Sequence, residues 1–533
     1  MENQRLKFSS NRLFQRLINW VGALLLVMPP LAIAVSSGPE LYQTHCAECH
    51  GTDRLGSIGP ALLPGNLKRL RQSKAEAVIK QGRIATQMPA FGEALTDDEI
   101  KQLAEYTFTP PEVLPEWTAE DIRASRIIHS PEAISGNYDD AEPVYDADPL
   151  NLFLVVESGT HHVSVLDGDR LEPIHRFKSR FALHGGPKYS STGRYVYFAS
   201  RDGWITKFDM YRLEVIAEIR AGINTRNAAV SADDRYLLVG NYLPHELVLL
   251  DARDLSLIKI IPVIGSNGES SRVSAVYTAP PRNSFIIALK DVEELWELNY
   301  ADDPPLGFAA NWNHDYRKES GDTDNAPFPV KVRPIEGYLD DFFFDQEYVR
   351  IIGSSRDGGT RVFDLDLGRV THTLDLQGLP HLASGITWPY KDTTVLATPN
   401  IKNAEVSIID MQTWETIKRI PTKGAGFFMR SHENSPYAWV DVFFGENKDL
   451  MHVIDKQNLE IIKTLKPAPG KTSAHIEFTR DGSKALLSIW ELDGELVVYN
   501  SDTLEEIKRI PMSKPVGKYN VYNKITRSEG TSH

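Results

Sequence analysis

The chain has 533 residues, of which 41% are hydrophobic and 24% are charged, and its formal net charge is −14 at pH 7. This length exceeds what one hydrophobic core supports, about 250–300 residues, so we expect two or more domains. The acidic balance argues against general nucleic-acid binding, which requires a basic surface, and we predict no nucleic-acid partner.

The N-terminal segment predicts export from the cytoplasm. Basic residues between positions 5 and 16 precede an apolar run over residues 18–35, which ends near an Ala-Ile-Ala site. These features are typical of a secretory signal peptide, so we predict that residues 1–35 are cleaved and that the mature protein is periplasmic. An uncleaved membrane anchor is the alternative, because the apolar run approaches transmembrane length.

The segment "THCAECH" holds Cys46 and Cys49, the two cysteines of the chain, directly before His50. C-x-x-C-H is the attachment signature of a c-type haem, in which both thiols bond to the vinyl groups and the histidine ligates the iron. A redox disulfide is the alternative for a C-x-x-C pair in an oxidising compartment. We predict a covalently bound haem c at this motif.

The sequence after this motif favours the haem interpretation. We expect a helix near residues 74–83, and "QMPAFGEALTDDEIKQLAEYTF" places Met88 in a loop before Thr96, whose hydroxyl can cap the next helix. This pattern resembles the class I cytochrome c domain, in which such a loop methionine is the sixth iron ligand. His/Met ligation suits electron transfer, because no coordination position stays open. We therefore predict a small all-α class I cytochrome c domain over residues 36–110, with His50 and Met88 as axial ligands.

The rest of the chain predicts a second, all-β domain. Residues 111–147 are a linker rich in Pro, Asp and Glu, with a short helix expected at 119–125. Residues 148–533 repeat a unit of turns and alternating apolar and polar runs eight times, at a period of roughly 40–50 residues, which indicates an eight-bladed β-propeller. A β-solenoid is the alternative, but its repeats are shorter. A longer insertion at residues 301–337 is a candidate lid.

Three propeller histidines stand just before or within the first strand of a unit, and we predict that they line the central cavity. They are His184, His381 and His475. The two glycines after His184 allow close approach of a flat ligand. The remaining loop histidines are expected to be exposed or structural: His161, His162, His245, His314 and His432.

A class I cytochrome c followed by an eight-bladed propeller resembles the cytochrome cd1 family, whose propeller binds haem d1. The resemblance covers nearly all of the mature chain and rests on "HGGPKYSSTGRYVYFASRDGWITKFDM", "GINTRNAAVSADDRYLLVGNY" and the C-terminal "PVGKYNVYN", which resembles the family's closing strand. It implies that His184 ligates the d1 iron and that Arg201, Arg226 and Tyr242 line the pocket. Both arginines are candidates to hold the carboxylates of haem d1, and an exposed blade turn is the alternative for each.

The departures from the nitrite reductases of this family indicate a different activity. Those enzymes place two distal histidines over the iron; His381 corresponds to one, whereas Asp340 stands at the position of the other. Loss of one proton donor should impair reduction of nitrite to nitric oxide, which consumes two protons. In addition, His475 and Tyr519 stand where the reductases have neither a histidine nor a tyrosine.

This pattern resembles the dihydro-haem d1 dehydrogenases, which share the domain order and oxidise a propionate of the precursor to the acrylate of haem d1. The resemblance implies that His475 ligates the iron beside or instead of His184, and that His381 and Tyr519 are acid/base groups near the propionate. It also implies electron transfer to haem c and then to a soluble periplasmic acceptor, with a cytochrome cd1 nitrite reductase as recipient of haem d1. A nitrite reductase and a non-enzymatic haem d1 carrier are the alternative functions.

Overall fold

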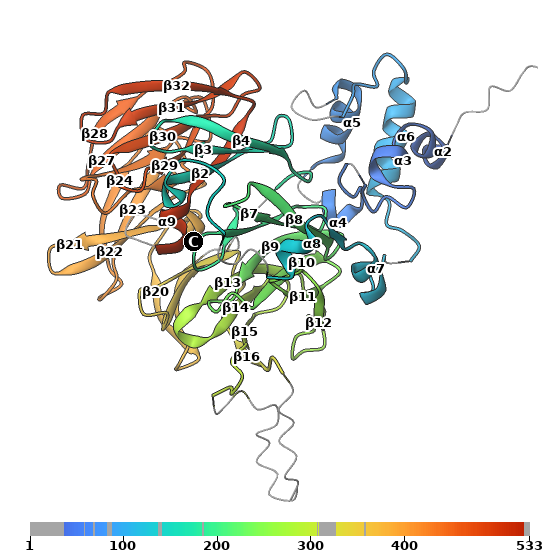
Figure 1. The fold of residues 1–533 in the computed structure, drawn as a ribbon, viewed down its shortest axis with the longest axis horizontal. Coiled ribbons are helices and arrows are strands. Elements are labelled where there is room, and N and C mark those ends of the chain that lie inside the picture. Colours follow the sequence, from blue (N-terminus) through green and yellow to red (C-terminus); the bar gives the residue numbers. More distant parts are fainter. Residues whose placement is uncertain are drawn as a thin grey trace, which may run out of the picture.

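The computed structural model describes residues 37–526, except 58, 68–69, 83–87, 114, 137–140, 184–185, 306–307, 309–326 and 356–358. The described residues form a small helical part beside a ring of eight antiparallel sheets (Figure 1). The predicted signal peptide, His184, His314 and most of the 301–337 insertion lie outside the described residues. Within the part of the chain that the structure describes, no helix has the length and apolar character needed to cross a membrane.

Helices α2 to α6 make up the N-terminal part. Their bounds are α2 Gly38–His45, α3 Ala47–His50, α4 Pro64–Leu67, α5 Gln72–Gln81 and α6 Asp97–Phe108. The predicted cap of α6 is confirmed, because the Thr96 hydroxyl accepts a hydrogen bond from the Glu99 amide and the Glu99 carboxylate accepts one from the Thr96 amide. Leu41 and Tyr42 of α2 pack against Leu103 of α6 and form the core of this part.

The first four sheets of the ring follow one another along the chain, and the first also holds the C-terminal strand. Blade 1 comprises β2 Leu152–Glu157, β3 His162–Asp167, β4 Glu172–Lys178 and β33 Pro515–Asn520. Blade 2 comprises β5 Lys188–Tyr189, β6 Tyr195–Ala199, β7 Trp204–Asp209, β8 Glu214–Arg220 and β1 Ile127–Ile128. Blade 3 comprises β9 Asn224–Val230, β10 Tyr236–Leu243, β11 Glu246–Asp251 and β12 Leu257–Pro262. Blade 4 comprises β13 Val273–Ala279, β14 Ser284–Leu289, β15 Glu294–Asn299 and β16 Val330–Pro334.

The other four sheets complete the ring in the same order. Blade 5 comprises β17 Asp341–Phe344, β18 Arg350–Ser354, β19 Thr360–Asp364 and β20 Arg369–Leu374. Blade 6 comprises β21 Ile386–Tyr390, β22 Thr393–Pro399, β23 Glu405–Asp410 and β24 Thr416–Pro421. Blade 7 comprises β25 Met429–Arg430, β26 Tyr437–Asp441, β27 Met451–Asp455 and β28 Glu460–Leu465. Blade 8 comprises β29 Ser473–Phe478, β30 Lys484–Ile489, β31 Gly494–Asn500 and β32 Glu506–Met512. The predicted eight-bladed propeller is therefore confirmed.

The C-terminal strand closes the ring, as its sequence predicted. Strand β33 pairs antiparallel with β2, placing Tyr519 opposite Leu154 and Lys518 opposite Val155. Helix α9 (Val521–Thr526) follows directly and packs near the short 3₁₀ helix Pro149–Asn151 at the start of blade 1. Because β33 and β2 belong to one sheet, residues from the two ends of the propeller sequence lie side by side in blade 1.

The blades stack on one another through their apolar faces. Between blades 6 and 7, for example, Ile386 and Trp388 pack in one buried cluster with Met429 and Val440. Burial of such side chains stabilises the fold by about 1.5–3 kcal/mol each, so the stacked blades hold the inner strands firmly in place. These inner strands and the loops beside them line the central cavity.

The connector attaches the helical part to blades 2 and 3. Helix α7 (Ala119–Ala124) confirms the short helix expected there, and β1 adds to the outer edge of blade 2 by pairing with β8. The Trp117 indole donates to the Arg220 carbonyl at 2.9 Å, while the Arg220 guanidinium donates to the Leu55 carbonyl of the helical part. The short helix α8 (Pro131–Ile134) follows on the same side. These contacts hold the helical part against the propeller.

Candidate haem and tetrapyrrole site

The C-x-x-C-H motif lies at the corner between α2 and α3. Cys46 and Cys49 are free cysteines, so both thiols are available for thioether bonds. The His50 Nδ1–H donates to the Pro60 carbonyl at 2.8 Å, which leaves Nε2 as the ring nitrogen for a metal. A Cβ at Gly59 would come within 2.8 Å of His50 Cε1, so only glycine permits this close approach. Burial lowers the pKa of His50, which keeps the imidazole neutral.

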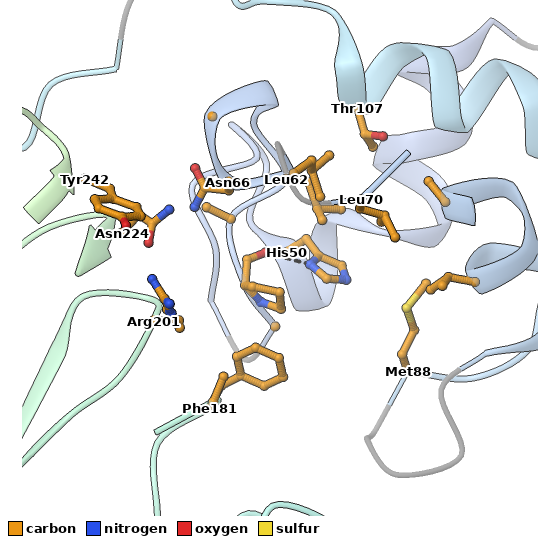
Figure 2. Close-up of a pocket in the computed structure, with 18 of the residues that line it drawn as sticks. His50, Leu62, Asn66, Leu70, Met88, Thr107, Phe181, Arg201, Asn224 and Tyr242 are labelled. Carbon is orange, nitrogen blue, oxygen red and sulfur yellow. Dashed lines mark hydrogen bonds between the residues drawn. The ribbon is translucent and has the colours of Figure 1, made fainter. Parts of the chain in front are cut away.

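These groups line a cavity of about 1220 Å³, which Met88 borders from a separate loop (Figure 2). Leu62 and Leu70 contribute apolar walls to the same cavity. A c-type haem with His/Met ligation needs two thiols that bond to its vinyl groups, and an imidazole nitrogen and a thioether sulfur that ligate its iron. The residues present therefore fit haem c.

The haem c cavity continues to the mouth of the propeller. Figure 2 shows Phe181, Arg201 and Tyr242 of the propeller across from the cytochrome residues. The Arg201 guanidinium lies 5.7 Å from the centre of the Tyr242 ring, within the range of a cation–π contact. His161 also lines this cavity and packs on Phe181 with ring centres 5.2 Å apart. The expectation that His161, His162 and His245 are exposed was wrong, because each of these residues is half-buried.

A second cavity, of about 410 Å³, lies among the inner strands of the propeller. It brings together four residues singled out from the sequence, which lie in blades 3 and 8, in the closing strand and in the loop before blade 6: Arg226, His381, His475 and Tyr519. Tyr242, Lys290 and Asp340 line both cavities, so the two cavities adjoin at these residues.

His475 occupies an unusual backbone position on β29. Its φ is +54°, a left-handed conformation that non-glycine residues rarely adopt, and the pairing of β29 with β30 shifts register there. Such a bulge redirects a side chain, and the His475 ring packs 4.8 Å from the Phe428 ring and 5.3 Å from the Tyr519 ring. Among the described residues, none forms a hydrogen bond with its buried Nδ1. Burial, with Lys518 and Arg430 nearby, holds the pKa of His475 well below its usual value, so the ring stays neutral.

His381 precedes the 3₁₀ helix Leu382–Ser384 in the loop before blade 6. Its Nδ1–H donates to the Phe427 carbonyl at 2.6 Å, and its ring stacks on the Phe427 ring with centres 4.0 Å apart. This bond fixes the tautomer and leaves Nε2 with a lone pair, as a general base requires. Burial lowers the pKa of His381, so the ring is neutral around pH 7.

Tyr519 extends from the closing strand β33 beside His475. Burial raises its pKa to about 12, which keeps the phenol protonated as a hydrogen-bond donor. A Cβ at Gly186 would lie 3.1 Å from the Tyr519 ring, and one at Gly517 would lie 2.6 Å from its hydroxyl. Glycines thus leave room around this side chain.

Charged residues line the second cavity, and two of them, Lys290 and Asp340, also line the haem c cavity. The Arg226 guanidinium donates to the Ser274 carbonyl at 2.8 Å and lies 3.4 Å from the Asp341 carboxylate. Asp340, at the position of a reductase histidine, forms an ion pair with Lys290. Arg226 is therefore well inside the propeller rather than on an exposed blade turn.

Sequence reasoning missed a group of buried charged residues behind the two histidines. They are Arg430, Asp441, Glu477 and Lys518, each at most 5% exposed. Lys518 Nζ donates to the His475 carbonyl, and burial raises the pKa of Asp441 to about 7. The signal in the sequence was a charged residue at an inward-facing strand position. Such residues are almost never fully buried without a partner, so each of them implies a second buried charged group.

The cytochrome fold and the histidine-lined propeller define a class of two-domain haem proteins. A family model described as Cytochrome D1 heme domain matches residues 147–524, and the chain belongs to this family. A second model, described as Cytochrome C oxidase, cbb3-type, subunit III, matches residues 34–106. The predicted combination of an all-α cytochrome c with an eight-bladed propeller is confirmed.

The chain is 54% identical to the dihydro-heme d1 dehydrogenase of Pseudomonas aeruginosa, over 96% of this chain and 99% of that protein. A solved structure described as dihydro-heme d1 dehydrogenase NirN in complex with DHE has a TM-score of 0.84 at 53% identity, over 92% of this chain and all of that chain. A nitrite reductase of Stutzerimonas stutzeri is 23% identical over 92% of this chain and 95% of that protein. The similarity to the dehydrogenase is thus much higher than that to the reductase.

Proposed function

We propose that the protein is a periplasmic dehydrogenase that converts a propionate side chain of dihydro-haem d1 to the acrylate of haem d1. The observation that carries this proposal is the meeting of His381, His475 and Tyr519 in one cavity that adjoins the haem c cavity. The 54% identity to a dihydro-heme d1 dehydrogenase supports the same reaction.

The reaction removes one hydrogen from each of two adjacent carbons, and a carbon–carbon double bond forms between them. Two protons and two electrons leave the substrate for each acrylate made. Haem c, held at Cys46 and Cys49 with His50 and Met88 as the proposed iron ligands, would carry these two electrons one at a time to the soluble periplasmic acceptor. The protein itself binds the substrate, orients the side chain and accepts one proton, and the second proton passes to solvent.

His381 is the proposed proton acceptor. Its Nδ1–H is held by the Phe427 carbonyl, so Nε2 is the nitrogen that can take a proton from a substrate methylene group. The lowered pKa keeps Nε2 unprotonated at neutral pH, before the reaction begins. After proton transfer, the same Phe427 carbonyl stabilises the imidazolium by accepting its Nδ1–H.

His475 and Tyr519 are proposed to fix the substrate beside this base. The neutral His475 imidazole can ligate the tetrapyrrole iron, in addition to or in place of His184. The protonated Tyr519 phenol can donate a hydrogen bond to the reacting propionate. Arg201, Arg226 and Tyr242 are proposed to bind the other carboxylates of the tetrapyrrole at the side facing haem c.

Nitrite reduction is not favoured as the activity. Asp340 is ion-paired with Lys290, so the position of the second reductase histidine holds a carboxylate that already has a cationic partner. The proposed reaction requires an electron acceptor, for which a soluble periplasmic protein is the proposed partner, and a nitrite reductase is the proposed recipient of haem d1.

Product mass tests the proposal most simply. Oxidised holoprotein is incubated with half an equivalent of dihydro-haem d1 without oxygen or nitrite, so that two haem c groups are present for each substrate, and haem c absorbance is followed. We expect the tetrapyrrole to lose the mass of two hydrogens while haem c becomes reduced. Holoprotein whose haem c is already reduced is the control and should give no product. Tight binding without a mass change would instead support the carrier function.

A further inference from the structure

The buried carboxylate of Asp441 holds a pair of phenylalanines. Asp441 ends β26 and is fully buried, and its Oδ1 accepts the backbone amides of Phe427 at 2.7 Å and Phe428 at 3.0 Å. Its own amide donates back to the Phe428 carbonyl at 3.2 Å. One residue thus fixes both peptide units of this dipeptide.

The same dipeptide contacts both histidines of the central cavity. The Phe427 carbonyl accepts the His381 Nδ1–H, and the Phe427 ring stacks on the His381 ring. The Phe428 ring packs against the His475 ring. A shift of the Phe427–Phe428 backbone would therefore move the carbonyl that sets the His381 tautomer. It would also move the Phe428 ring, against which the His475 ring packs.

Asp441 also lies against the backbone of His475. The His475 amide points at Asp441 Oδ2 at 3.5 Å, and the His475 carbonyl accepts from Lys518 Nζ. His475 has the strained φ of +54° described above. Strained residues persist where the surrounding structure over-determines them, and here the two flanking groups are the buried carboxyl group of Asp441 and the buried amine of Lys518.

We propose that Asp441 is a positioning residue for the dehydrogenation, which fixes His381 and His475 relative to each other through the Phe427–Phe428 dipeptide. This inference rests on the proposed function. Asp441 lines neither cavity, so its carboxylate acts through its neighbours and not by contact with the substrate. Burying a carboxyl group costs free energy unless it is hydrogen-bonded. The hydrogen bonds from the amides of Phe427, Phe428 and His475 offset this cost for Asp441.

The test compares Asp441→Ala and Asp441→Asn with the wild-type holoprotein. Asp441→Ala removes the acceptor of all three amides, and we expect kcat to fall about 10- to 100-fold, as for other positioning residues of metal sites. The KM for dihydro-haem d1 should stay within about twofold, because the groups that contact the substrate remain. Asp441→Asn keeps one oxygen for the phenylalanine amides but turns an NH₂ group toward the His475 amide. Its kcat should therefore lie between that of the wild type and that of Asp441→Ala.

A spectroscopic readout separates positioning from turnover. The absorption spectrum of oxidised, bound dihydro-haem d1 reports the iron ligand, and we expect it to change in both variants because His475 loses the acceptor of its amide. Asp167→Asn is the matched control. Asp167 is 1% exposed and its Oδ1 accepts the amides of Asp169 and Arg170, but it lies in blade 1 and lines neither cavity. Its spectrum and kcat should equal those of the wild type.

Two results would overturn the inference. One is an Asp441→Asn protein with wild-type kcat and an unchanged spectrum of the bound tetrapyrrole. The other is a rise in KM with kcat unchanged, which would make Asp441 part of substrate binding only. Failure of the proposed function itself is distinguishable, because the wild-type protein would then bind dihydro-haem d1 without converting it.

Discussion

Replacing His381 by Asn tests the roles of its two ring nitrogens separately. In the wild type the His381 Nδ1 lies 2.6 Å from the Phe427 carbonyl oxygen. The Asn Nδ2 occupies nearly the position of this nitrogen and can still donate to that carbonyl. The variant has no counterpart of Nε2, so it lacks the proposed base. Its fold should change little, because the substitution removes mainly the stack on Phe427, and such ring pairs contribute about 0.5–1.5 kcal/mol.

Loss of a general base lowers kcat by about 10²- to 10⁴-fold, which corresponds to about 2.7–5.4 kcal/mol of activation free energy. Single-turnover formation of haem d1 measures this directly, and substrate affinity should stay near the wild-type value. In the wild type, activity should fall on the acid side below about pH 6.5, since burial lowers the pKa of His381 from that reference value. In His381→Asn this acid limb should disappear.

His432→Asn is the control, because His432 is also buried but lines neither cavity. Its kcat should match that of the wild type. A His381→Asn protein that retains wild-type kcat would refute the assignment of His381 as the base. A similar loss of kcat in His432→Asn would show that the effect is not specific to the cavity.

Three further predictions concern the haem, the substrate carboxylates and stability. Met88→Ala should lower the haem c reduction potential, because methionine ligation raises it; potentiometric titration checks this, and an unchanged potential would exclude Met88 as the ligand. Arg226→Gln should raise the KM for dihydro-haem d1 about tenfold or more with little change in kcat, as expected for one charge-assisted hydrogen bond, and an unaltered KM would contradict that role. His452 is 1% exposed and burial lowers its pKa to about 4. Between about pH 6.5 and 4 the unfolded chain binds a proton at His452 that the folded protein does not, so stability falls by about 1.4 kcal/mol for each unit that the pH is lowered. His452→Gln should remove up to about 3 kcal/mol of this acid sensitivity in urea unfolding, and identical pH dependence in both proteins would refute it.

Much of the fold could be predicted because it depends on local patterns. Alternating strands at a fixed period specify stacked blades. The Thr96 cap could be predicted for the same reason, since a capping residue acts on the helix that follows it. The family resemblance, not a local pattern, implied that the C-terminal "PVGKYNVYN" closes the ring, which β33 does by pairing with β2. The two-residue strand β1 was not predicted, because so short a segment carries no periodicity.

The site was only partly predictable. His381 and His475 were selected by their positions at the first strands of the repeat units and Tyr519 through the family resemblance, and the structure brings all three into one cavity, although their roles stay proposals. His184 lies outside the described residues. Asp441 and Lys518 escaped notice because a single charged residue in a strand does not reveal a buried partner from another blade. The place of His161 at the haem c cavity depends on how the two parts of the chain meet, which no local pattern encodes.

The central claim is that hydrogens leave two adjacent carbons of a propionate. Dihydro-haem d1 deuterated at both methylene groups of the reacting propionate, turned over anaerobically by the oxidised holoprotein, tests this most directly by deuterium NMR of the product, which shows the position of each remaining deuterium atom. The account predicts loss of two deuterium atoms, one from each carbon, with haem c reduced in step. Retention of all four deuterium atoms, or loss of both from a single carbon, would contradict it.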